Sequence, residues 1–251
     1  MEKCVAVGIS ARHPVSPFFA VVFANMYRVL SRPATLIFDN HYDIGVSRSK
    51  VAETFLKTTD CEKLIIVDTD IVPYRCSERG ELLECSVDYY ALNEMLEKYS
   101  QYSVISVYHW SKRFEPNAYR VKRLERLGED VYLVDYEPLY LELNTGVHEV
   151  DFAGMSITMI DREVLEAVGF PWFKVVYTKL PDGRNFEMGE DVYFYMKLRE
   201  RGFKAYVTTD IVALHLGELA LDLYNRVRQI AFSWHDAPYK GARHRDRWGG
   251  A

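Results

Sequence analysis

Apolar runs alternate with helical patterns along the first 70 residues, and this alternation constrains the fold more than any other feature. Residues 3–9, 34–38 and 64–67 are short apolar runs typical of buried strands. Between them, Pro14 and Pro17 open a predicted helix that extends to about Leu30, and residues 46–57 predict a second helix. Strand, helix, strand, helix, strand is typical of parallel βαβ units, so we expect an α/β fold.

The pattern changes beyond residue 108. A helix at 87–99 and a strand at 102–108 are followed by residues 117–143, which alternate apolar and polar side chains as half-exposed antiparallel hairpins do. Strand character returns at 150–160, and Asp161 can cap a short helix that extends to Val168. The remaining predicted elements are a polar loop at 179–188, a helix at 190–201, strands at 204–207 and 211–215, and a last amphipathic helix.

Composition and charge exclude several classes of protein. A chain of 251 residues suits one large α/β domain, and its net charge of −5 does not favour nucleic-acid binding. The four cysteines have no CxxC spacing, so we expect reduced thiols. Because no apolar stretch is long enough to cross a membrane, we predict a soluble, cytoplasmic protein. Residues 236–251 are basic and predict a flexible tail, with weak contact to a membrane surface as the alternative.

Two carboxylates follow the third predicted strand. Leu64 to Val67 form an apolar run that leads directly to Asp68-Thr69-Asp70. Ligands of open α/β sheets bind beyond the carboxyl ends of the strands, where Ser10, Arg12 and Asp39 are also expected. Like charges at such a position repel each other unless a cation lies between them, and Mg²⁺ or Mn²⁺ prefers oxygen ligands. The alternative is a strand end rich in turn-forming Asp.

Further candidates lie in the second half of the chain. Glu190 and Asp191 open a helix after a Gly-containing loop, where a carboxylate could accept a proton from a hydroxyl, or could simply favour the helix dipole. His215 follows an apolar run and could complete a metal site, or could be a structural residue. Trp172 could stack on a sugar ring or pack in the core.

The order of these motifs resembles GT-A glycosyltransferases, especially the family 2-like group. The resemblance extends from about Val5 to Gly217 and includes the Asp-Thr-Asp strand end, the segment 152–156, the Gly-Glu-Asp helix start, the late His, and residues 46–52. It implies a GT-A fold with a mixed, mainly parallel sheet flanked by helices and a smaller antiparallel subsheet. It also implies one catalytic domain over 1–235, with a nucleotide-binding half (1–108), an acceptor half (109–217) and a C-terminal helix (218–235).

The resemblance also implies roles for individual residues. Asp70 would bind a Mn²⁺ or Mg²⁺ cofactor, Asp68 would bind the ribose or the metal, and His215 would be a further ligand. Asp191 would be the catalytic base, with Glu190 beside it. The residues expected to contact the donor nucleotide or the sugars are Ser10, Arg12, Asp39, Arg48, Gly154, Met155, Ser156 and Trp172.

The predicted activity is therefore a metal-dependent, hexosyltransferase-like glycosyl transfer, with inversion. The donor would be a UDP- or GDP-sugar, and the acceptor hydroxyl would belong to a glycan, a lipid or a small molecule. Two alternatives stay open. One is a haloacid-dehalogenase-like phosphatase with Asp68 as the nucleophile, and the other is a nucleotide-sugar-binding module without catalysis.

Overall fold

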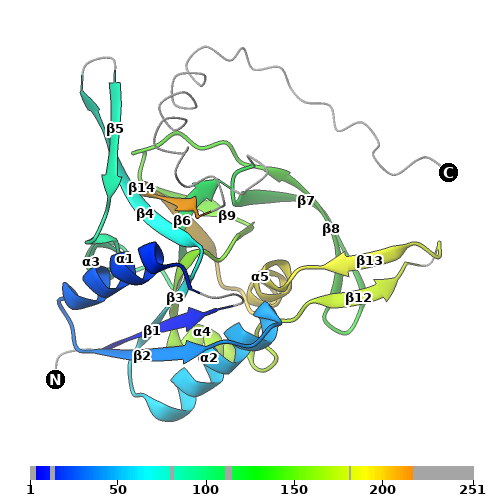
Figure 1. Cartoon of the computed structure of the whole chain (residues 1–251). Coiled ribbons are helices and arrows are strands. Elements are labelled where there is room, and N and C mark those ends of the chain that lie inside the picture. Colours follow the sequence, from blue (N-terminus) through cyan, green and yellow to red (C-terminus); the bar gives the residue numbers. More distant parts are fainter. Residues whose placement is uncertain (1–3, 12–14, 80–81, 111–114, 181, 217–251) are drawn as a thin grey trace.

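The computed structural model describes residues 4–11, 15–79, 82–110, 115–180 and 182–216 (Figure 1). Five helices lie within these residues, and four of them match the predicted helices closely. The helices are α1 (Pro17–Arg28), α2 (Ile44–Thr58), α3 (Ala91–Lys98), α4 (Arg162–Val168) and α5 (Glu190–Glu200). The predicted C-terminal helix (218–235) and the basic tail (236–251) lie outside the described residues.

A nine-stranded mixed sheet forms the centre of the molecule. Its strands are β1 (Val5–Ser10), β2 (Ala34–Asp39), β3 (Lys63–Asp68), β4 (Ile71–Arg79), β5 (Leu82–Val87), β6 (Val104–Trp110), β9 (Val147–Val150), β11 (Ile157–Asp161) and β14 (Ala205–His215). The order is β2-β1-β3-β11-β6-β14-β4-β5, and β9 also pairs with β14. The predicted parallel unit β2-β1-β3 is confirmed, and β6 pairs with β14 in parallel as well. The other pairings are antiparallel, so the sheet is less parallel than we expected.

Helices cover both faces of this sheet and create two hydrophobic cores. Successive side chains of a strand point to opposite faces. Val5 and Val7 of β1 accordingly pack with α1 and α3, while Ala6 packs with α2, α4 and α5. Helix α2 packs very close to β1 at Gly8: a Cβ atom on this residue would lie only 2.3 Å from Val51 Cγ1. The glycine therefore sets how near α2 can come to the sheet.

Two smaller sheets complete the fold. Strands β7 (Ala118–Gly128) and β8 (Val131–Pro138) form the predicted antiparallel hairpin, and β10 (Phe152–Ala153) adds a third strand beside β7. Residues 139–143, predicted as strand, follow β8 without belonging to it. Strands β12 (Val176–Lys179) and β13 (Asn185–Met188) form a hairpin where we expected only a loop, and Figure 1 shows it projecting from the body of the molecule.

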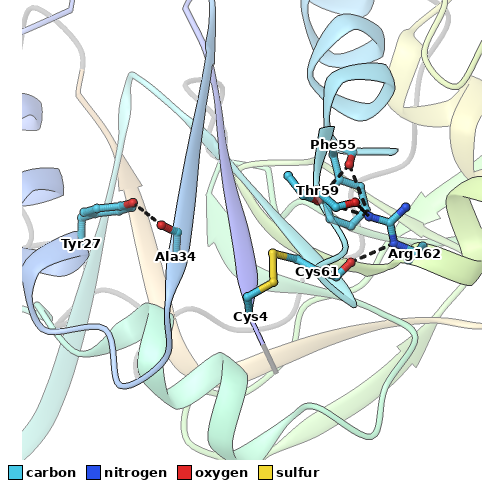
Figure 2. The surroundings of a disulfide bond; sticks show 7 residues. All are labelled: Cys4, Tyr27, Ala34, Phe55, Thr59, Cys61 and Arg162. Carbon is cyan, nitrogen blue, oxygen red and sulfur yellow. Dashed lines mark hydrogen bonds between the residues drawn. A yellow bond between two sulfur atoms is a disulfide. The ribbon is translucent and has the colours of Figure 1, made fainter. Parts of the chain in front are cut away.

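A disulfide joins Cys4 and Cys61, whose Cα atoms are 4.8 Å apart (Figure 2). The prediction of reduced thiols is wrong for this pair, because both cysteines precede neighbouring parallel strands and so lie at the same edge of the sheet. Next to the disulfide, Arg162 donates hydrogen bonds to the carbonyls of Phe55, Thr59 and Cys61, at and beyond the end of α2. The described helices are all too short or too polar to cross a bilayer, and the cytoplasmic location stays a prediction.

Candidate active site

A cavity of about 650 Å³ lies at the carboxyl ends of β1 and β3. Ser10 and Asp68 end these strands and are register neighbours. The cavity is bounded on other sides by Asp70, by the segment 152–156, by His215 at the end of β14, and by the first turn of α5. A strand end and a helix start more than 100 residues apart therefore contribute to one cavity.

Arg48 lies at the centre of an ionic cluster in the lining of this cavity. Its side chain is only 3% exposed. One guanidinium nitrogen, Nη2, donates to both carboxylate oxygens of Asp68, at 3.0 and 2.8 Å, and to the carbonyl of Met155 at 2.9 Å. The other, Nη1, donates to Glu190 Oε1 at 2.9 Å and to Asp191 Oδ1. Arg48 thereby holds acidic groups from β3 and α5 in a fixed arrangement.

Burial controls the protonation of this cluster. It raises the pKa of Asp68 to about 7 and that of Asp191 to about 6, although Arg48 acts in the opposite direction. Burial alone would lower the Arg48 pKa, but the three carboxylates raise it more, so the guanidinium stays charged. Asp191 is thus a carboxylate whose pKa lies close to neutrality, as a general base requires.

Asp70 and His215 form the part of the cavity that fits a metal ion. Asp70 Oδ2 lies 3.5 Å from His215 Nδ1, and this nitrogen is buried without a hydrogen-bond partner in the described part of the chain. A carboxylate oxygen and an imidazole nitrogen are suitable ligands for a divalent cation. No three His, Cys, Asp or Glu side chains gather around a common point among the described residues. The part of the chain that the structure describes therefore offers two ligands here, and phosphate oxygens of a substrate could supply others.

Sequence reasoning missed two polar residues of the cavity, His109 and Asn117. Buried His109 contacts His215 edge to face, with ring centroids 5.2 Å apart. Its pKa is lowered to about 3, first by burial and then by His215, so the ring is neutral. Asn117 accepts a hydrogen bond from the His109 backbone and donates one to the Gly154 carbonyl, which fixes the segment 152–156 against β6. Neither residue belongs to a recognisable motif.

Three aromatic residues were also missed as cavity residues: Tyr119, Tyr136 and Phe152. The alternation of apolar side chains along 117–143 indicated a hairpin but not that one of its faces borders a cavity. Tyr119 is directly opposite Phe152 in the β7–β10 pairing, whereas Tyr136 lies on the neighbouring strand β8.

The structure separates the predicted site residues into three groups. Those that line the cavity are Ser10, Arg48, Asp68, Asp70, Gly154, Met155, Ser156, Glu190, Asp191 and His215. Asp39 does not line it; its carboxylate accepts a hydrogen bond from the His41 backbone and lies 3.8 Å from Lys50 Nζ. Trp172 does not line the cavity either; it packs in the core, the alternative that the sequence left open, and donates to the Leu165 carbonyl. Arg12 lies outside the described residues.

Comparison with known proteins supports the fold. No protein-family model matches the sequence, and no curated protein matches it. The crystal structure of A197 from STIV is similar, with a TM-score of 0.52 and 21% identity over 84% of both chains. The crystal structure of GalNAc-T7 with UDP, GalNAc and Mn²⁺ aligns with a TM-score of 0.44 and 11% identity, over 86% of this chain and 44% of that one; this likeness is too weak to support an inference.

The topology and the likeness to A197 confirm that the chain has a GT-A fold. At this level of identity the likeness establishes the fold alone. It does not distinguish family 2 from other families that share the fold, and it does not identify the reaction.

Proposed function

We propose that this chain is a metal-dependent glycosyltransferase, related to the family 2-like group, that transfers a sugar from a nucleotide diphosphate donor to an acceptor hydroxyl. The observation that carries the proposal is the single cavity shared by the strand-end pair Asp68 and Asp70, the late His215, and Glu190 and Asp191 at the start of α5. Each motif alone has a structural explanation. Their convergence on one cavity of a GT-A fold favours the functional one.

The donor side of the cavity comprises the strand ends. Asp70 and His215 would hold Mn²⁺ or Mg²⁺, which when bound stabilises the negative charge that develops on the leaving diphosphate. Asp68 has both oxygens on Arg48, so we assign it to the donor ribose rather than to the metal. Ser10 and Ser156 have buried hydroxyls without hydrogen-bond partners among the described residues, and they suit contacts with the donor.

Asp191 is the proposed catalytic base. Its carboxylate receives the proton of the acceptor hydroxyl while the acceptor oxygen bonds to the anomeric carbon. The bond from that carbon to the diphosphate oxygen breaks, and its electron pair leaves with the diphosphate. A positioned base accelerates such a step by about 10²–10⁴-fold. Because one base acts in one displacement, we expect inversion at the anomeric carbon.

Arg48 has a different role from the nucleotide contact that the resemblance implied. Its side chain is enclosed by carboxylates and by the Met155 carbonyl. We assign it as a positioning residue that holds Asp191 and Asp68 at their places in the cavity.

The phosphatase alternative is less well supported. Asp68 ends β3 rather than the first strand, and its two oxygens face Arg48, an arrangement that restrains a nucleophile. The ion pair of Arg48 with Asp191 is the feature closest to the second alternative, a binding module without catalysis, because it favours the unprotonated carboxylate. Burial outweighs this effect and raises the pKa of Asp191 to about 6, which suits a base.

The domain limits remain part of the proposal. We infer one catalytic domain over 1–235, which includes a C-terminal helix at 218–235, followed by a basic tail at 236–251. The proposed donor is a UDP- or GDP-sugar.

A donor screen tests the proposed function. The full chain is incubated with UDP- and GDP-sugars, a mixture of glycan acceptors and Mn²⁺, and release of the nucleoside diphosphate is measured. We expect release with one donor class, its loss on chelation of the metal, and at least a 100-fold lower rate for Asp191→Asn, which preserves the shape of the side chain. Asp70→Ala should abolish the dependence on Mn²⁺ together with turnover. Donor binding without consumption would favour the binding module, and phosphate release from sugar phosphates would favour the phosphatase.

A further inference from the structure

We propose that the acceptor is a neutral carbohydrate, and that one face of its pyranose ring stacks on an aromatic wall formed by Tyr119, Tyr136 and Phe152. This inference rests on the proposed function, since it concerns the acceptor side of the same cavity. It selects a glycan over the lipid and over other small molecules as the acceptor class.

The small sheet brings the three rings together. Tyr119 and Phe152 face each other across the β7–β10 pairing, and their rings stack with centroids 4.7 Å apart and planes 15° from parallel. Tyr136 projects from β8, where it pairs with Val121, two residues from Tyr119. Side chains two residues apart share a face of the sheet, so the pairing explains why Tyr136 reaches the other two rings.

Tyr136 is held rigidly and yet stays accessible. Its ring is nearly perpendicular to both neighbours, with centroids 5.1 Å from Tyr119 and 5.0 Å from Phe152. These edge-to-face contacts fix its orientation, while 48% of the residue remains exposed. An exposed aromatic ring in a fixed orientation can bind a ligand with little loss of side-chain entropy.

The polar groups around the wall suit a sugar. A pyranose has an apolar face of C–H groups and an edge of hydroxyls, so its site needs an aromatic surface beside hydrogen-bonding groups. The same cavity is lined by the carboxylates of Glu190 and Asp191. A lipid chain would displace water from these carboxylates and offer them no hydrogen bond in return, which is unfavourable.

The charge of the cavity further restricts the acceptor. Four acidic residues line it, with Arg48 as a buried counter-charge. Repulsion from these carboxylates disfavours an anionic acceptor close to Asp191. A neutral sugar hydroxyl avoids this repulsion.

Saturation-transfer difference NMR on the full chain, with UDP and Mg²⁺ present, tests the inference. The probes are maltose, cellobiose, lactose and N,N′-diacetylchitobiose, with n-octanol as the apolar alternative. We expect at least one disaccharide to bind, with the strongest transfer on the C–H groups of one ring face. Tyr136→Ala should weaken its binding about tenfold, comparable to the loss of an aromatic stacking contact. Tyr136→Phe, which keeps the ring, should retain the binding.

Tyr177→Ala is the matched control, because Tyr177 is 74% exposed on β12 and does not line the cavity. The inference is wrong if none of the disaccharides binds, if n-octanol binds in their place, or if Tyr136→Ala binds as the wild type does. Donor consumption with no disaccharide binding would overturn this inference and leave the proposed function standing. Disaccharide binding that depends on Tyr136, without donor consumption, would overturn the proposed glycosyl transfer and leave the carbohydrate-binding wall standing.

Discussion

Replacing Arg48 with Met tests the ionic cluster most directly, because Met keeps an apolar stem and removes the charge. The wild-type guanidinium is buried against the carboxylates of Asp68, Glu190 and Asp191. Removing one partner of a buried ion pair costs about 3–5 kcal/mol, since the remaining charge is left without compensation. We expect Arg48→Met to lower the free energy of unfolding by this amount at pH 8.

The cost should depend on pH. Asp68 and Asp191 have pKa values raised from 3.8 to about 7 and about 6. A carboxyl with a raised pKa in the folded state contributes most to stability when protonated, so wild-type stability should fall as the pH rises from about 4 to 7. Loss of Arg48 removes the cation that lowers both pKa values, so both rise further. At pH 5 the carboxyls of the folded variant are then protonated, and the substitution should cost about half as much as at pH 8.

Urea unfolding followed by tryptophan fluorescence at pH 5 and pH 8 measures this difference. Arg162→Met is the matched control, because Arg162 donates mainly to backbone carbonyls near the end of α2, which do not titrate. Its cost should be the same at both pH values. An equal cost of Arg48→Met at the two pH values, or a cost below about 1 kcal/mol at pH 8, would refute the assignment of Arg48 as the counter-charge of the cluster.

Two further predictions concern the base and the disulfide. The turnover rate should rise with pH through about 6, because Asp191 must lose its proton before it can accept one and its pKa is about 6. A rate that stays constant between pH 5 and 8 would exclude Asp191 as the base. The double substitution of Cys4 and Cys61 by Ser should lower the free energy of unfolding by about 4 kcal/mol, since the disulfide closes a loop with a sequence separation of 57 residues. A urea midpoint equal to that of the oxidised wild type would show that the disulfide does not stabilise the fold.

The first half of the fold was predictable because its strands are apolar and its helices are amphipathic. Strands β1, β2 and β3 and helices α1 and α2 lie within a few residues of their predicted limits. The hairpin of β4 and β5 was not predicted, because Pro73 interrupts the strand pattern and charged residues occur along it without a regular alternation. The disulfide left a weak signal: Cys4 lies at the start of the first predicted strand, and Cys61 lies three residues before the third, in one parallel unit.

The site residues were predictable only where their place relative to a predicted strand or helix indicates their role. Asp68 and Asp70 end an apolar strand, and Asp191 begins a helix, so their sequence neighbours locate them. The environment of Arg48 depends on contacts with residues as many as 143 positions away. The sequence around it contains no sign that the side chain is buried. Tyr136 is similarly ambiguous, since an aromatic residue on a hairpin can face solvent, a core or a cavity.

Helix α2 shows how the rest of the fold supports the site. At its start, the Asp43 carboxylate accepts a hydrogen bond from the Val46 backbone, and beyond its end Arg162 satisfies free carbonyls. Gly8 lets the middle of the helix pack tightly on β1. Arg48 lies in the second turn of this fixed helix, so its guanidinium holds the proposed base before any substrate binds. Charged groups positioned in advance need no reorganisation during the reaction. The edge of the sheet at the disulfide, although it lies outside the cavity, therefore contributes to the site by fixing the helix that carries Arg48.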